Sequence, residues 1–77
     1  EIAIFPNPLE DKFFVSSNID IIGFEILDVS GKAIHKEDHL NTQQIEFSDA
    51  KKLGKGLFFI RLVTSDQQIF IRRMLKI

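Results

Sequence analysis

Apolar residues in this chain occur in short alternating bursts, and Gly, Pro, Asn, Asp or Ser residues separate each burst from the next. Alternating polarity places one face of an extended strand in a core, and the residues in between favour turns. The bursts predict seven strands, at residues 2–5, 12–16, 22–29, 32–37, 44–48, 57–64 and 68–76. Turns that recur about every ten residues are typical of an antiparallel β-sandwich or a small β-barrel. The predicted fold class is therefore all-β.

Three of the predicted strands carry apolar residues on both faces. Segment 57–64 is apolar on both faces, which predicts a central strand. The end of segment 22–29 is also expected to be covered on both faces, because Val29 continues its second apolar face. Segment 68–76 has apolar residues on both faces, and Arg73 interrupts one of them. A bulge or a frayed end would explain that pattern, and both alternatives stay open.

Turn signals separate the strands. Asp28–Lys32 is the clearest, because Gly31 can adopt a positive φ and the leading Asp can accept a hydrogen bond from the backbone N–H two residues on. A second glycine turn is expected at Leu53–Gly56. Polar residues from Ser17 predict a turn between the second and third strands. The only helix signal is a single turn with Ser48 as its cap.

The length of 77 residues allows one domain, which we assign to residues 1–77. A chain this short buries only about 60% of its unfolded surface, so its stability is marginal. It contains no cysteine, which excludes a disulfide framework and a thiolate metal site. No run approaches the roughly 20 apolar residues of a membrane helix, and the start lacks the features of a signal peptide. We expect a piece of a longer protein whose export signal lies elsewhere.

The residue types offer no catalytic or metal-binding arrangement. No serine lies between flanking glycines as in a nucleophile elbow, and Gly54–Gly56 lacks the spacing of a phosphate loop. His35 and His39 are four residues apart, but an extended segment separates such residues by roughly 13 Å, too far for one ion. We therefore expect two exposed histidines, no metal, no cofactor and no enzyme activity.

The aromatic composition bears on possible ligands. Eight phenylalanines occur without tyrosine or tryptophan. Sites for sugars and nucleic acids favour exposed aromatic rings, often with a polar group. Phenylalanines at alternating strand positions instead predict core packing. The composition therefore argues against a nucleic-acid partner and a small-molecule substrate.

The net charge of −1 conceals an uneven distribution. Residues 1–50 contain three basic and ten acidic side chains, whereas residues 51–77 contain seven basic and one acidic. The basic residues of the last third have two interpretations. They can form solvated strand faces and edges that pair with the acidic half, or they can form an electrostatic docking patch for a partner.

Four segments carry a family resemblance. Phe5-Pro6-Asn7-Pro8 is similar to the aromatic-Pro-Asn-Pro motif of the C-terminal sorting domains of the type IX (Por) secretion system of Bacteroidetes. Phe24–Lys32 resembles that family's strand ending in Asp-x-x-Gly-Lys/Arg, Leu53–Leu62 its Leu-x-x-Gly-(Ile/Val)-Tyr strand, and Arg72–Lys76 its basic-apolar-basic ending. The candidate sorting-signal residues are Pro6, Asn7, Pro8, Asp28, Gly31, Lys32, Leu53, Gly56, Phe58, Arg72, Arg73 and Lys76.

The resemblance implies an immunoglobulin-like antiparallel β-sandwich of about seven strands and a non-catalytic C-terminal tag. Such a tag follows an N-terminal cargo domain that crosses the inner membrane by its own signal peptide. The type IX translocon of the outer membrane then recognises the folded tag, and a sortase-type surface protease commonly removes it. The implied location is the periplasm in transit, then the outer-membrane surface or the extracellular space.

A different interpretation is an immunoglobulin- or fibronectin-like adhesion or carbohydrate-binding module of an extracellular enzyme. A sorting domain ends its protein, whereas an adhesion module need not. The departures from the family pattern are small: Phe5 and Phe58 stand where tyrosine is usual. The identity of the cargo, the surface that contacts the translocon and the oligomeric state stay open.

Overall fold

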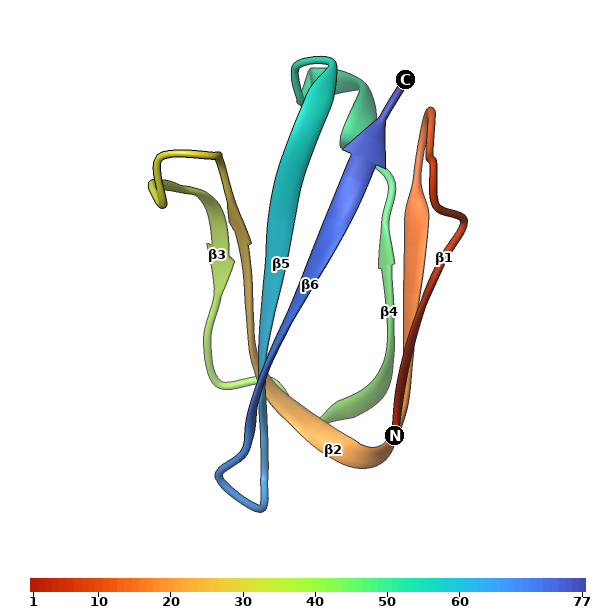
Figure 1. Cartoon of the computed structure of the whole chain (residues 1–77). Helices are drawn as coiled ribbons and strands as arrows, with labels where there is room; N and C mark the ends of the chain where they lie inside the picture. Colours follow the sequence, from red (N-terminus) through yellow and green to blue (C-terminus); the bar gives the residue numbers. More distant parts are fainter.

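The computed structural model describes residues 1–77 and contains six strands and one turn of 3₁₀-helix (Figure 1). In chain order the elements are β1 (Ile2–Phe5), β2 (Phe13–Leu27), β3 (Ala33–Glu37), β4 (Thr42–Phe47), the helical turn η1 (Ala50–Lys52), β5 (Gly56–Thr64) and β6 (Ile69–Lys76). All paired strands are antiparallel, so the predicted all-β class is confirmed. No helix is long and apolar enough to span a membrane.

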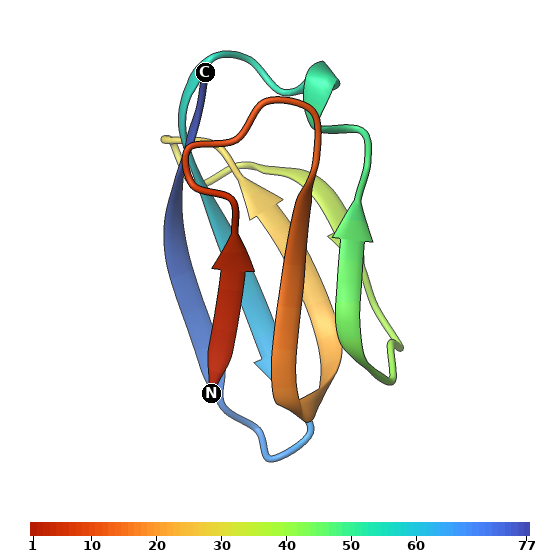
Figure 2. The same cartoon turned by 90° about the vertical axis from the view of Figure 1, so that its right-hand side faces the viewer.

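The sheet is built around β2. The first half of β2 lies between β1 and β4, and the second half lies between β3 and β5, with β6 beyond β5. The sheet folds back on itself at the middle of β2, so that the part with β1 and β4 faces the part with β3, β5 and β6 (Figure 1 and Figure 2). The predicted sandwich therefore arises from one curled six-stranded sheet.

The turn expected from Ser17 is a bend within β2, which makes six strands rather than seven. Pairing with β4 shifts register between Ser16 and Ile21. The Ser17 hydroxyl accepts a hydrogen bond from the Ile19 N–H at 3.0 Å and donates one to the Ile19 carbonyl at 2.6 Å. These bonds satisfy backbone groups where β2 leaves one neighbour for another. The strand therefore bends without ending.

A bulge follows the bend and keeps the apolar residues inside. Pairing with β5 advances from Ile21 to Gly23 on β2 while β5 advances by one residue, so Ile22 is an extra residue. An extra residue reverses the inward and outward alternation of a strand. Val15 and Ile21 point into the core before the bulge, and Phe24 points into it afterwards. Both halves of β2 thus bury their apolar side.

Aromatic rings fill the space between the two parts of the sheet. Phe13 is completely buried, and its ring centroid lies 5.3 Å from that of Phe47 and 6.1 Å from that of Phe24. Phe58 packs on Phe13 from β5 at 6.3 Å. The other core residues are Leu9, Val15, Ile21, Ile26, Ala50, Ile60, Leu62 and Met74. The expected aromatic core is confirmed at these four phenylalanines, whereas Phe5 is 49% exposed.

The two C-terminal strands form a regular pair. β5 is central, as predicted, because β2 and β6 pair with its two edges. β6 pairs with β5 without a register shift from Ile69 to Lys76, so the expected bulge or frayed end is absent. Met74 on its inner side is buried, whereas Ile71 and Leu75 on its outer side are exposed. The mixed pattern of β6 therefore reflects apolar residues that face solvent.

Two local expectations are wrong. Val29 was expected to be covered, but it lies beyond the end of β2 and is 72% exposed. β2 ends at Leu27 and the Asp28–Lys32 turn follows, so Val29 has no paired strand beside it. The N-cap of η1 is Asp49 rather than Ser48, and no side chain makes a capping hydrogen bond.

The two histidines lie in different environments. His35 was expected to be exposed, but its ring packs 4.9 Å from the Phe47 ring, and its Nε2 lies 2.7 Å from a carboxylate oxygen of Glu37. His35 is therefore half-buried on edge strand β3. His39 follows β3 in an exposed loop with φ 59°. No group of three or more His, Cys, Asp or Glu side chains is placed to hold a metal ion.

The core packing leads to a stability prediction. Phe13→Ala should lower the free energy of unfolding by about 3–5 kcal/mol, because it leaves a cavity among three other rings. Ile34→Ala is the matched control, since Ile34 is 46% exposed on β3 and should change stability by about 0.5 kcal/mol or less. Urea denaturation followed by circular dichroism measures both. Equal effects of the two substitutions would contradict the described core.

Candidate functional site

The segments that carry the four sequence motifs lie at one end of the sandwich (Figure 1 and Figure 2). We call this the motif end: it comprises segment Pro6–Leu9, the turns Asp28–Lys32 and Leu53–Gly56, and the last residues of β6, Arg73–Ile77. Because β2 bends back in its middle, both its start and its finish lie at this end. The N-terminus lies at the opposite end.

The N-terminal and C-terminal motifs are hydrogen-bonded to each other. The Asn7 side-chain oxygen accepts the Leu75 N–H at 3.1 Å, although the two residues are 68 positions apart. The Leu9 N–H donates to the Leu75 carbonyl, and the Ile77 N–H donates to the Leu9 carbonyl, both at 3.0 Å. Leu9 and Lys76 form an isolated parallel bridge. Segment Asn7–Leu9 therefore covers the free edge of β6 over its last residues.

Sequence reasoning identified Asn7 but missed Leu9 and Leu75. Pro6 and Pro8 flank Asn7 and are exposed, and β1 ends at Phe5 as the prolines predicted. Leu9 is 1% exposed and anchors this segment in the core. A signal for it existed, because Leu9 is the single aliphatic residue between the two prolines and β2.

The Asp28–Lys32 turn is organised by one carboxylate. The Asp28 Oδ1 atom accepts the Ser30 N–H at 2.9 Å, the Ser30 hydroxyl at 2.6 Å and the Lys32 N–H at 3.0 Å. Gly31 has φ 88°, and its N–H donates to the Asp28 carbonyl at 3.0 Å. The predicted roles of Asp28 and Gly31 are confirmed. The hydrogen bond from the Ser30 hydroxyl, followed by that from the Lys32 N–H, lowers the pKa of Asp28 below its ordinary value of 3.8.

The Leu53–Gly56 turn connects η1 to β5. Leu53 packs against the core, and its N–H donates to the Ala50 carbonyl at 3.0 Å. Gly56 has φ 114°, which favours glycine, and pairs with Lys76 of β6. Phe58 is 3% exposed, so its ring supports the core and a partner cannot contact it directly.

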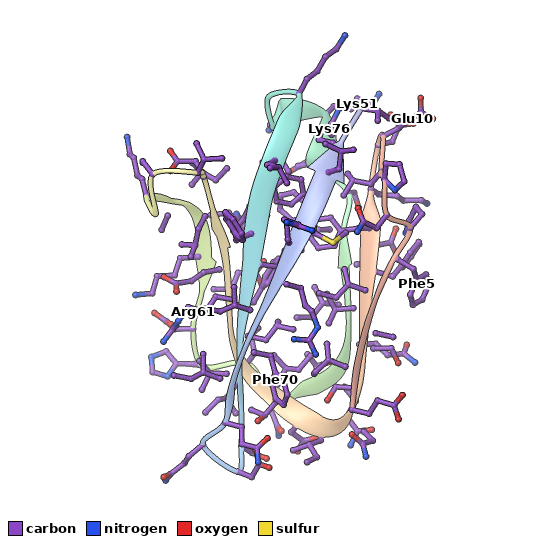
Figure 3. The ribbon with its side chains drawn as sticks, viewed as in Figure 1. Phe5, Glu10, Lys51, Arg61, Phe70 and Lys76 are labelled. Atoms are coloured by element: carbon purple, nitrogen blue, oxygen red, sulfur yellow. The ribbon has the colours of Figure 1, made fainter.

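The three basic motif residues of β6 do not share one side of the strand. Arg72 and Lys76 lie opposite Ile60 and Gly56, whereas Arg73 lies on the outer side opposite Phe59. The Arg72 guanidinium stacks on the Phe70 ring at 5.6 Å. Figure 3 shows Lys76 and Lys51 at the same end of the molecule.

The structure tests whether the basic last third pairs internally with the acidic half. Arg61 pairs with Glu25 at 2.9 Å, and Lys52 pairs with Asp49 at 4.0 Å. The basic residues of this third that form no ion pair are Lys51, Lys55, Arg72, Arg73 and Lys76. Internal pairing therefore accounts for a minority of these charges. The remainder lie on β6 and at the motif end, where a partner with negative charge can reach them.

The motif end contains a shallow hollow rather than an enclosed cavity. Its volume is about 460 Å³, and its lining includes Asp28, His35, Lys52 and Leu53. Two motif turns therefore border the same depression. Some side chains of the motif end hold its turns and strand ends in place. Others present positive charges to solvent, as a binding surface for an acidic partner would.

The curled six-stranded sheet and the motif end together define a small β-sandwich recognition domain. The family model described as "Secretion system C-terminal sorting domain" matches residues 3–76. The chain belongs to that family, whose domains are the C-terminal secretion signals of type IX cargo. Membership implies export to the cell surface or the extracellular space.

One solved structure supports the fold. The chain is similar to part of PorZ from Porphyromonas gingivalis, described as an essential bacterial surface component of the type-IX secretion system. The TM-score is 0.72 at 14% identity, and the match covers 99% of this chain and 11% of the PorZ chain. No curated protein matches the chain.

The Asp28 turn gives a pH-dependent prediction. Because the fold lowers the pKa of Asp28, its ionised form stabilises the folded state above pH 3.8, and this contribution is lost as the pH falls through the lowered pKa. Asp28→Asn should reduce the melting temperature at pH 7, and the difference from wild type should shrink in acid. Asp11→Asn, whose side chain makes no hydrogen bond here, should have little effect at either pH. A pH-independent difference for Asp28→Asn would contradict this role.

The contact between Asn7 and β6 gives a second prediction. Asn7→Ala should speed hydrogen exchange at the Leu75 amide, because that N–H loses its acceptor, and should cost about 1 kcal/mol of stability. NMR-detected exchange measures the effect residue by residue. Asn41→Ala is the control, since the Asn41 side chain makes no hydrogen bond. Unchanged protection of Leu75 in Asn7→Ala would contradict the contact.

Proposed function

We propose that residues 1–77 are the C-terminal sorting domain of a larger secreted cargo protein and that the type IX machinery recognises the motif end. The observation that carries this proposal is the hydrogen bond between Asn7 and Leu75, which unites the first and last motifs of the chain. Neither motif has this shape in an unfolded chain. Recognition of the motif end therefore selects a folded domain.

The position of the N-terminus supports this arrangement. It lies at the far end of the sandwich from the motif turns (Figure 2). A cargo domain that precedes Glu1 would leave the motif end accessible. The domain acts without catalysis, as a recognition element that travels through the periplasm to the translocon.

The candidate signal residues have distinct roles in this proposal. Asn7, Asp28, Gly31 and Gly56 hold the backbone of the motif end, and Phe58 and Leu53 support it from the core. The basic and proline side chains are exposed or partly exposed: Pro6, Pro8, Lys32, Arg72, Arg73 and Lys76. We assign direct contact with the machinery to that exposed set. A sortase-type surface protease then removes the domain before or near Glu1.

A reporter fusion tests the proposed function. A periplasmic reporter that carries this chain at its C-terminus should reach the cell surface or the medium of a Bacteroidetes strain with an active type IX system. The same reporter without the chain should stay in the periplasm, as should the fusion in a strain without the translocon. Protease accessibility on intact cells measures the surface fraction. Equal surface delivery with and without the translocon would contradict the proposal.

A further inference from the structure

One side of the β5–β6 pair is apolar and faces solvent. Side chains alternate along a strand, so the neighbours of the buried core residues point outward. Ile69, Ile71, Leu75 and Leu57 on this outward side are 56%, 55%, 41% and 47% exposed. We call this surface the β5–β6 face, and it comprises Leu57, Phe59, Arg61, Val63, Ile69, Ile71, Arg73 and Leu75.

Apolar residues face each other across the two strands at both ends of the face, and in its middle Ile71 lies opposite Arg61 and Phe59 opposite Arg73. Leu57 lies opposite Leu75, and Val63 lies opposite Ile69. Figure 3 shows Arg61 and Phe70 on opposite sides of this pair, so the face is separate from the side that packs on the core. Several exposed apolar side chains on one side of a sheet mark a binding site in a soluble protein, because their exposure to water is unfavourable.

The two arginines of the outward side differ in their partners. The Arg61 guanidinium donates to a Glu25 carboxylate oxygen at 2.9 Å, which satisfies its charge within the sheet. Arg73 lies opposite Phe59 between apolar neighbours and forms no ion pair. An apolar partner surface that covered this guanidinium would bury an unpaired charge, which is unfavourable. A partner surface that also places a carboxylate beside the guanidinium would pair that charge and bind more tightly.

The face runs into the motif end. A hollow of about 440 Å³ joins them, and its lining includes Asn7, Pro8, Leu57, Arg73 and Leu75. Arg73 and Leu75 therefore border both surfaces. A partner that contacts Asn7 and Pro8 through this hollow would also cover part of the β5–β6 face.

We propose that the β5–β6 face docks onto a protein surface of the export machinery that is apolar and places a carboxylate opposite Arg73. This inference rests on the proposed function and names the surface that the machinery contacts. The face contains one free arginine and no free carboxylate, since Glu25 is already paired. The complementary surface is therefore acidic.

Two other occupants fit the face less well. A symmetric pair of these chains would set the same face against itself, so that two unpaired Arg73 side chains would approach each other. A lipid surface is disfavoured because the chain has no tryptophan or tyrosine to sit at a membrane interface. Charge complementarity thus favours an acidic protein.

Charge reversal in the full-length fusion tests the face. Arg73→Glu and Ile71→Ser should each reduce the surface fraction of the reporter by about tenfold, as expected when a buried interface contact is lost. The controls are Asp38→Lys, a charge reversal in the exposed loop after β3, and Asn41→Ser, at an exposed side chain before β4 that makes no hydrogen bond; both positions lie outside the hollows of the motif end. Both should be exported like wild type. Melting temperatures of all four variants separate lost docking from lost folding.

A photo-crosslinking residue at position 71, with one at position 41 as control, identifies the occupant. The expected result is an adduct at position 71 alone, formed with a protein of the type IX machinery. An Asp or Glu of that protein should lie beside the crosslinked site. Changing that residue to Lys should restore export of the Arg73→Glu fusion. Adducts with lipopolysaccharide, with a second copy of the chain or with the cargo's own domain would overturn the inference, as would normal export of Arg73→Glu and Ile71→Ser. Failure of the unsubstituted fusion to use the translocon would instead overturn the proposed function.

Discussion

The fold depends on the bend and bulge of β2. One strand of 15 residues pairs with β1 and β4 in its first half and with β3 and β5 in its second. Without the bulge at Ile22, a regular strand that buries Val15 would turn Phe24 toward solvent, because side chains alternate with a period of two. The extra residue reverses that alternation, and the hydroxyl of Ser17 satisfies the backbone of Ile19 at the bend. Two parts of one sheet can then share one core.

The same bend brings the sorting motifs together. It returns β2 to the end from which it started, so the segment before β2 and the turn after it become neighbours of the C-terminus. The hydrogen bonds of Asn7 and Leu9 to the last residues of β6 then join the two ends of the sequence. A short domain without disulfides thereby gathers its motifs at a single end opposite its N-terminus. Its unpaired basic residues lie on β6 and around that end, where an acidic partner could reach them.

The elements predicted correctly from the sequence have local causes. Prolines end β1 after Phe5, Gly31 and Asp28 form their turn, and two apolar faces identify β5 as the central strand. The predictions that failed have non-local causes. Polar residues from Ser17 onward suit a turn and a bend equally, and the partners on either side of β2 decide between them. His35 sits on an edge strand, yet two phenylalanine rings from other strands cover part of it.

The sequence by itself determined the all-β class, the principal turns and the motifs that identify the family, because alternation, glycine and proline act over a few neighbouring residues. The tertiary structure alone decided that the motifs meet, that Leu9 and Leu75 belong with Asn7, and that Arg61 is paired while Arg73 is free. It also decided that the outer side of β6 is apolar and uncovered. Each of these facts depends on which distant strands become neighbours, and one bend in β2 sets that choice.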